Sequence, residues 1–156
     1  FSGKDVLILA VFEQTIHRAR DHYRGQIATL RDPMDRLHLI VNLLVLGREA
    51  LDSLPRRNGG RRGAAMSREH LRLAESHPEE LQTALLPLIS LIAEQLSDGM
   101  AANLVREGDP QRMASLVYNL VSTTVHRELL SPETARGDRE LLAADIWDFC
   151  ERAVAA

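Results

Sequence analysis

Four prolines that directly follow a polar or acidic residue divide this chain into helices. The pairs are Asp32–Pro33, His77–Pro78, Asp109–Pro110 and Ser131–Pro132. Proline disfavours a helical conformation in the residue before it, yet it is well tolerated in the first turn of a helix. A preceding aspartate can also accept a hydrogen bond from a free N–H of that turn. We therefore expect each pair to mark a boundary between helices.

Between these boundaries the apolar residues recur with the period of a helix, and no segment alternates with the period of a strand. The low aromatic content, 4%, and the many Leu, Ala and Arg residues also favour helix. We expect an all-α bundle of about six helices. They span residues 3–30, 33–54, 67–76, 77–107, 111–130 and 136–153, with Ser67 as an N-cap.

Three segments have special roles in this prediction. Residues 37–46, LHLIVNLLVL, are apolar nearly all round, so their helix should be central. Pro87 lies inside 77–107 and should kink that helix by freeing a backbone carbonyl. Residues 55–65, PRRNGGRRGAA, hold three glycines and four arginines and are expected to form a mobile basic loop.

Composition excludes several classes of function. The chain has 156 residues and a formal net charge of −3, so it lacks the positive excess of an unspecific nucleic-acid binder. Its single cysteine, Cys150, excludes an internal disulfide and fits a reducing compartment, which predicts a cytoplasmic protein. No apolar run is long enough to span a membrane. These features predict one domain with a real core and no membrane partner.

The last two helices each carry two apolar or uncharged faces. Residues 114–125, ASLVYNLVSTTV, contain no charge, although a surface helix would place Lys or Glu on its outer stripe. Such helices can bury both faces in a two-fold homodimer in which they form a four-helix interface. The alternative is a monomer that buries them centrally. The predicted dimer residues are Leu116, Leu120, Val121, Leu142, Ile146, Trp147, Phe149 and Cys150.

The first residues, FSGKDVLILAVFEQ, have the pattern of a helix start joined to a folded element. Ser2 is a good N-cap, and Phe1 and Val6 occupy the two positions of a hydrophobic staple. The stretch resembles the junction F-x-x-K-[DE]-x-L that begins the long linking helix of TetR-family transcriptional regulators. Residues 77–129 are similar to the long helix, acidic–proline turn and next helix of that family's ligand-binding half.

The resemblance covers residues 1–156 as one regulatory domain. It implies a linking helix at 1–30 and dimerisation helices within 111–156. The family's N-terminal helix-turn-helix, expected ahead of Phe1, would contact operator DNA, and the matching Lys4 would contact a phosphate. A solvated surface role for Lys4 is equally open.

Enzyme signatures are missing from the sequence. It contains no H-E-x-x-H, E-x-x-H, G-x-S-x-G, Walker A or dinucleotide-binding pattern. Glu13, His17 and Asp21 share one helical stripe that could hold a metal, although exposed surface is the commoner role for such a stripe. We therefore expect no enzyme activity, no cofactor and no metal site.

A pocket for a small apolar or amphipathic effector is the stronger expectation, because such pockets are apolar with a few placed polar groups. The alternative is that these residues are plain core or dimer contacts of a helical scaffold that binds no small molecule. The predicted pocket residues are Phe12, Ile16, Leu37, Val41, Leu44, Met66, His70, Leu88, Ile92, Gln95, Tyr118, Asn119, Ser122 and His126.

Overall fold

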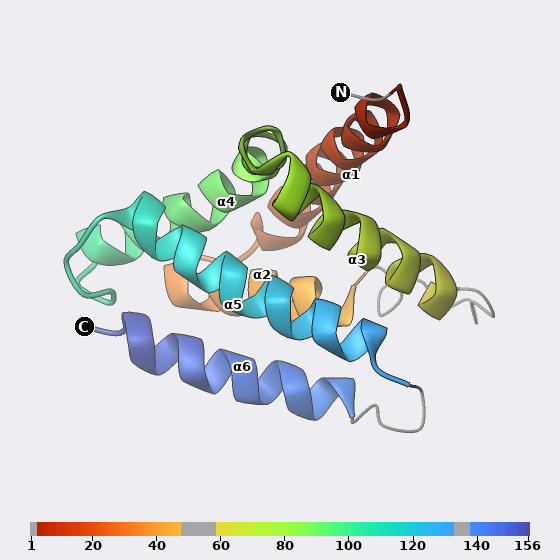
Figure 1. The fold of residues 1–156 in the computed structure, drawn as a ribbon. Coiled ribbons are helices and arrows are strands. Elements are labelled where there is room, and N and C mark those ends of the chain that lie inside the picture. The colour runs from red at the N-terminus through yellow and green to blue at the C-terminus, as the bar shows by residue number, and fades with distance from the viewer. Residues whose placement is uncertain (1–2, 48–58, 133–137) are drawn as a thin grey trace.

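The computed structural model describes residues 3–47, 59–132 and 138–156, and within these ranges the regular structure is six helices. The helices are α1 (Gly3–Ile27), α2 (Pro33–Leu46), α3 (Gly59–Ser76), α4 (Pro78–Ala101), α5 (Pro110–Leu130) and α6 (Arg139–Val154) (Figure 1). The expected all-α bundle of about six helices is confirmed. In the described ranges, no helix is both long and apolar enough to cross a bilayer.

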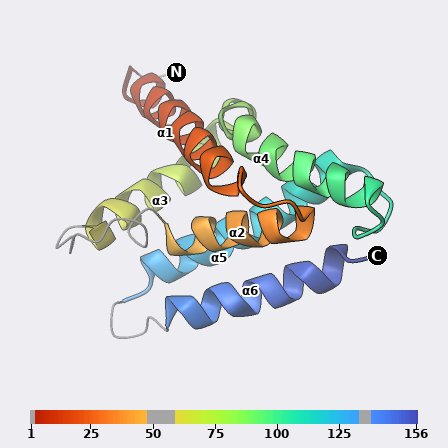
Figure 2. The same ribbon diagram turned by 180° about the vertical axis from the view of Figure 1, so that it is seen from behind.

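Helices α2 and α4 form the centre of the bundle. Helix α4 packs against α1, α5 and α2, while α2 also packs against α6, and α3 lies on α5 (Figures 1 and 2). The buried positions of α2 recur on nearly every side, as its apolar sequence predicts: Leu37, Ile40, Val41, Leu43 and Val45. Helices α5 and α6 run side by side in opposite directions along one edge (Figure 1).

Three helices begin at a proline of the predicted boundaries, Pro33, Pro78 and Pro110, and at two of them the preceding aspartate caps the helix. Asp32 accepts a hydrogen bond from the backbone N–H of Met34 at 2.7 Å. Asp109 accepts from the N–H groups of Gln111 and Arg112 at 3.0 and 3.3 Å. Each carboxylate satisfies N–H groups that the first turn leaves without a helical partner.

Several helix ends differ from the sequence prediction. Helix α1 ends at Ile27 instead of residue 30, and α2 ends at Leu46, before Gly47 with a φ of 70°. Helix α3 begins at Gly59, so the expected loop is helical from residue 59, while 55–58 lie outside the described residues. Arginine and alanine are good helix formers, and the prediction gave too much weight to the glycines between them.

Helix α4 continues through Pro87 but ends at Ala101, six residues before the predicted end. The chain turns at Asn103, whose φ is 60°, and Val105 then pairs with Ala155 near the C-terminus. The N–H groups of Leu104 and Val105 both bond the carbonyl of Gly99. Together with the bond from the N–H of Asn103 to the carbonyl of Met100, these bonds form a local cap that ends the helix at a left-handed residue.

Candidate functional site

A partly buried cluster of polar side chains lies where α1, α3 and α5 meet. His126 of α5 places its Nδ1 2.7 Å from the Oγ of Ser67 on α3, and its Nε2 3.0 Å from the Oγ of Ser122. Tyr118, one turn before Ser122, is hydrogen bonded to it. Because residues four apart share a helix face, Tyr118, Ser122 and His126 line one stripe of α5.

Aromatic contacts extend this group across the three helices. The ring of His70 on α3 lies 4.4 Å from that of His126, measured between centroids. Phe12 of α1 approaches His70 edge-on, with a centroid distance of 5.7 Å and an interplanar angle of 73°. We call Phe12, Ser67, His70, Tyr118, Ser122 and His126 the histidine cluster.

The histidine cluster is uncharged at neutral pH. Burial lowers the pKa of His70, and burial together with the neighbouring His70 lowers the pKa of His126 to about 4. Burial raises the pKa of Tyr118 against the effect of its hydrogen bond to Ser122. Among the described residues no carboxylate, lysine or arginine contributes to these shifts. The cluster thus offers neutral donors and acceptors at a partly buried site beside the apolar core.

The structure brings together five of the predicted pocket residues, Phe12, His70, Tyr118, Ser122 and His126. The sequence interpretation missed Ser67, which it assigned as a cap, although Ser67 lies inside α3 and is buried. Its spacing of three residues from His70 was the available signal. Of the other predicted positions, Ile16, Leu37, Val41, Leu88 and Ile92 are core residues, Leu44 and Met66 are half-buried, and Asn119 is exposed.

Gln95 of α4 is a further polar group in the core. Its side chain is buried, with 4% of the residue exposed, and its Nε2 donates to the carbonyl of Leu91 at 3.1 Å. Its Oε1 has no hydrogen-bond partner among the described residues. Since a buried acceptor is normally satisfied, this oxygen is available to a donor that enters the core.

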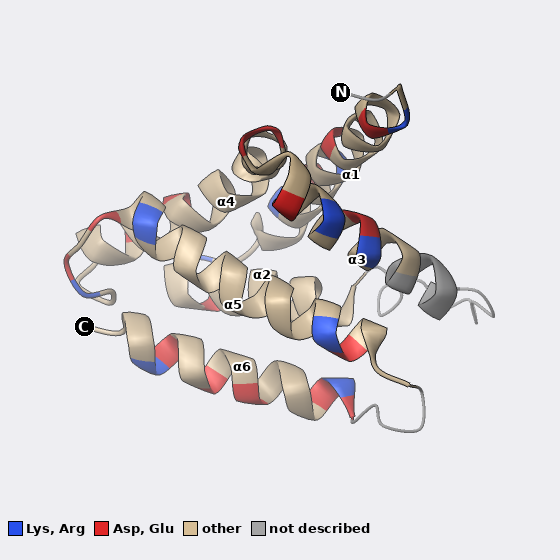
Figure 3. Cartoon of the chain, viewed as in Figure 1, with Lys and Arg blue, Asp and Glu red and all other residues tan. Residues whose placement is uncertain are grey.

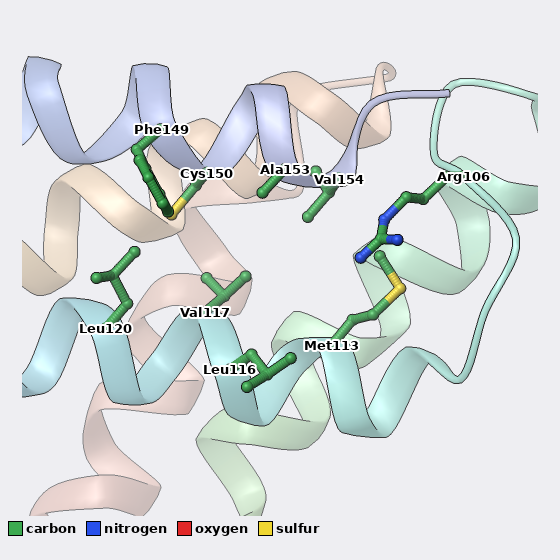
Figure 4. Close-up of a pocket in the computed structure, with 9 residues that line it drawn as sticks. All are labelled: Arg106, Met113, Leu116, Val117, Leu120, Phe149, Cys150, Ala153 and Val154. Carbon is green, nitrogen blue, oxygen red and sulfur yellow. The ribbon is translucent and has the colours of Figure 1, made fainter.

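A groove between α5 and α6 contains a cavity of about 280 Å³ (Figure 4). Its lining is Arg106, Met113, Leu116, Val117, Leu120, Phe149, Cys150, Ala153 and Val154. The lining is apolar apart from Arg106. It includes four of the predicted dimer residues and none of the predicted pocket residues. We refer to it as the α5–α6 groove.

The predicted dimer residues divide into exposed and buried groups. Leu116 and Phe149 are 63% and 64% exposed, and Leu120 is also exposed. Leu142 is half-buried, whereas Val121, Ile146, Trp147 and Cys150 are buried against their own chain. The ring of Trp147 stacks on His38 of α2, with centroids 4.5 Å apart. Leu141, which the sequence interpretation did not include, is strongly exposed.

The remaining candidates lie on the surface. The Nζ of Lys4 is 4.0 Å from a carboxylate oxygen of Glu69, and the lysine side chain is largely exposed. Glu13, His17 and Asp21 are exposed on α1. In the part of the chain that the structure describes, no group of three or more His, Cys, Asp or Glu residues is arranged to hold a metal ion.

No protein-family model and no curated protein matches the sequence. Among solved structures, the fold is similar to that of the fatty acid degradation regulator FadR from Bacillus halodurans, with a TM-score of 0.71. The match covers 97% of this chain and 76% of that chain, at 17% sequence identity. At this identity the likeness is one of fold. The chain therefore shares an all-helical fold with that protein.

Proposed function

We propose that this chain is the effector-binding and dimerisation domain of a TetR-type transcriptional repressor. The observation that carries the proposal is the histidine cluster, a neutral, partly buried polar group where three helices of a regulator-like fold meet. Apolar residues would pack this site at a lower cost in free energy, because each buried polar group needs a hydrogen-bond partner. The cluster therefore suits a ligand that is mostly apolar with one polar end.

The proposed effector enters the core between α1, α3, α4 and α5. The histidine cluster supplies hydroxyl and imidazole groups to its polar end, and Gln95 supplies a free carbonyl oxygen. Leu88 and Ile92 of α4 supply apolar surface. The structural neighbour regulates fatty acid degradation. Fatty acids and the corresponding alcohols are accordingly the first probes to test.

In this proposal the effector acts by shifting the position of α1, because Phe12, the α1 member of the histidine cluster, contacts His70 of α3 directly. Val6, Leu7 and Val11 are exposed apolar residues near the start of α1. They support the proposal that a helix-turn-helix domain joins and packs against this end of the helix. A change in the tilt of α1 would then misplace the DNA-reading element.

We further propose that a second copy of the chain covers α5 and α6. The middle of α5 carries no charged residue (Figure 3). Leu116, Leu141 and Phe149 are apolar and strongly exposed, and the α5–α6 groove lies between the two helices. A contiguous exposed apolar face of this kind is typical of an interface.

The effector proposal is tested by calorimetric titration of the chain with saturated fatty acids and alcohols of 8 to 16 carbons. The variants are Tyr118→Phe and Ser122→Ala in the cluster, with Ala153→Leu, which fills the α5–α6 groove, as the matched control. We expect each cluster variant to weaken binding about tenfold, the effect of one hydrogen bond to a buried ligand group. Ala153→Leu should leave the affinity unchanged.

Two results would contradict the assignment. If Ala153→Leu weakened binding while the cluster variants did not, the effector site would be the groove. If neither acids nor alcohols bound, the chain would fit the alternative of a helical homodimeric scaffold without a small ligand.

A further inference from the structure

One carboxylate ties together three helices near the start of α1. The side chain of Asp5 is only 13% exposed, and its Oδ1 accepts a hydrogen bond from the Nη2 of Arg72 on α3 at 2.8 Å. Its Oδ2 lies 3.0 Å from the Nε2 of His77, the residue that precedes the first turn of α4. We call Asp5, Arg72 and His77 the Asp5 clamp.

Within the Asp5 clamp, the contact between Asp5 and His77 is better shielded from water than the other ion pairs of the described residues, while the side chain of Arg72 is 40% exposed. The side chain of His77 is 18% exposed, whereas Arg24 and Glu94, which pair between α1 and α4, are both about half exposed. The guanidinium of Arg72 is also held by Glu69 at 2.8 Å. The hydrogen bond from Arg72, followed by that from His77, lowers the pKa of Asp5, so the carboxylate is charged at neutral pH.

Helix α3 connects the Asp5 clamp to the histidine cluster. Ser67 and His70 belong to the cluster, and Arg72 follows His70 by two residues on the same helix. The distance from residue 67 to residue 72 along the helix axis is only about 8 Å, because a helix rises about 1.5 Å per residue. A displacement of α3 at the cluster therefore carries Arg72 with it.

We propose that Asp5 is a positioning residue, through which a movement of α3 at the histidine cluster is transmitted to the first turn of α1. The contact of Phe12 with His70 is a separate link between α1 and α3, but it lies two turns further along α1. The inference rests on the proposed function, since it supplies the route from effector to linking helix. The experiments that test it measure only hydrogen exchange at the start of α1.

The first experiment measures amide hydrogen exchange of residues 3–9 in the ligand-free protein. Asp5→Asn keeps the shape of the side chain but removes its charge. We expect it to raise exchange in this segment by about an order of magnitude, as expected for a lost charged hydrogen bond. Asp5→Glu should restore part of the protection. Asp21→Asn, the same change at a side chain that is 70% exposed and paired with adjacent Arg20, should have no effect.

The second experiment tests transmission by a double-mutant cycle. Ser122→Ala perturbs the histidine cluster and is made in the wild-type and Asp5→Asn backgrounds. We expect it to change exchange in residues 3–9 only where the Asp5 clamp is intact. An equal change in both backgrounds would show that Phe12 or the core carries the movement. No change in either would show that the cluster and α1 are not coupled.

Both experiments use no ligand and no DNA. A failure of the clamp therefore leaves the effector proposal standing, and a failure of the fatty acid titrations leaves the clamp standing.

Discussion

Lowering the pH should destabilise the protein through His126. Its pKa is about 4 in the folded chain, against an ordinary value of 6.5. As the pH falls from about 6.5 to about 4, an unfolded chain takes up a proton at this residue and the folded chain does not. The free energy of unfolding must therefore decrease within this window. Above it, the ring is neutral in both states and has no effect.

The magnitude follows from the two pKa values. The pKa of His126 is 6.5 in the unfolded chain and about 4 in the folded chain, and a difference of one pKa unit corresponds to about 1.4 kcal/mol. Below both pKa values the full loss of unfolding free energy is therefore about 3 kcal/mol. About 2 kcal/mol of this unfolding free energy is lost between pH 7 and pH 5. The ring is only partly buried, so solvent screening reduces the expected loss to about 1 kcal/mol.

Urea unfolding at pH 7 and pH 5 measures this loss. The wild type is compared with His126→Gln, which keeps hydrogen-bonding atoms but does not titrate, and with His17→Gln on the exposed face of α1. The decrease in unfolding free energy between the two pH values should be about 1 kcal/mol smaller in His126→Gln than in the wild type. His17→Gln should behave as the wild type. Equal pH dependence in all three proteins would refute the neutral state of His126 in the folded protein.

Three further predictions concern stability and reactivity. Gly99→Ala should cost about 1–3 kcal/mol in urea unfolding, because the new Cβ would overlap the Cγ2 of Val105; an unchanged midpoint would contradict this close approach. Asp109→Ala should lower the free energy of unfolding by about 1 kcal/mol, because α5 loses its cap. The control Asp148→Ala removes only an exposed ion pair with Arg152, so its free energy of unfolding should lie within about 0.5 kcal/mol of the wild type. Cys150 is 1% exposed and burial raises its pKa to about 11, so a thiol reagent should modify it only after unfolding; rapid labelling of the native protein would contradict its burial.

The local parts of the fold could be predicted from the sequence because their signals are local. Asp109 and Pro110 lie next to each other, and helix α5 begins at Pro110 and ends at Leu130, close to the predicted limits. The apolar residues of 37–46 already indicated a central helix, and the structure buries five of them. Caps, prolines and helical periodicity act over a few residues, so a single sequence contains them.

The contacts that build the candidate site could not be predicted, because they join residues far apart in the chain. Ser67 and His126 are separated by 59 positions, and Asp5 and Arg72 by 67. The residue types gave a signal for His126, but no local pattern indicated that Ser67 would face it. The pairing of Val105 with Ala155 is likewise a contact between residues far apart in the chain.

The mass of the chain in solution tests the proposed regulator most directly, because the proposal requires two copies joined through α5 and α6. Sedimentation equilibrium should give twice the chain mass of 17.4 kDa for the wild type. Leu116→Glu, at a residue that is 63% exposed, should give a folded monomer. Val11→Glu, at an exposed position of α1 away from α5 and α6, should remain a dimer. A wild-type protein that sediments as a monomer at high concentration would contradict the account.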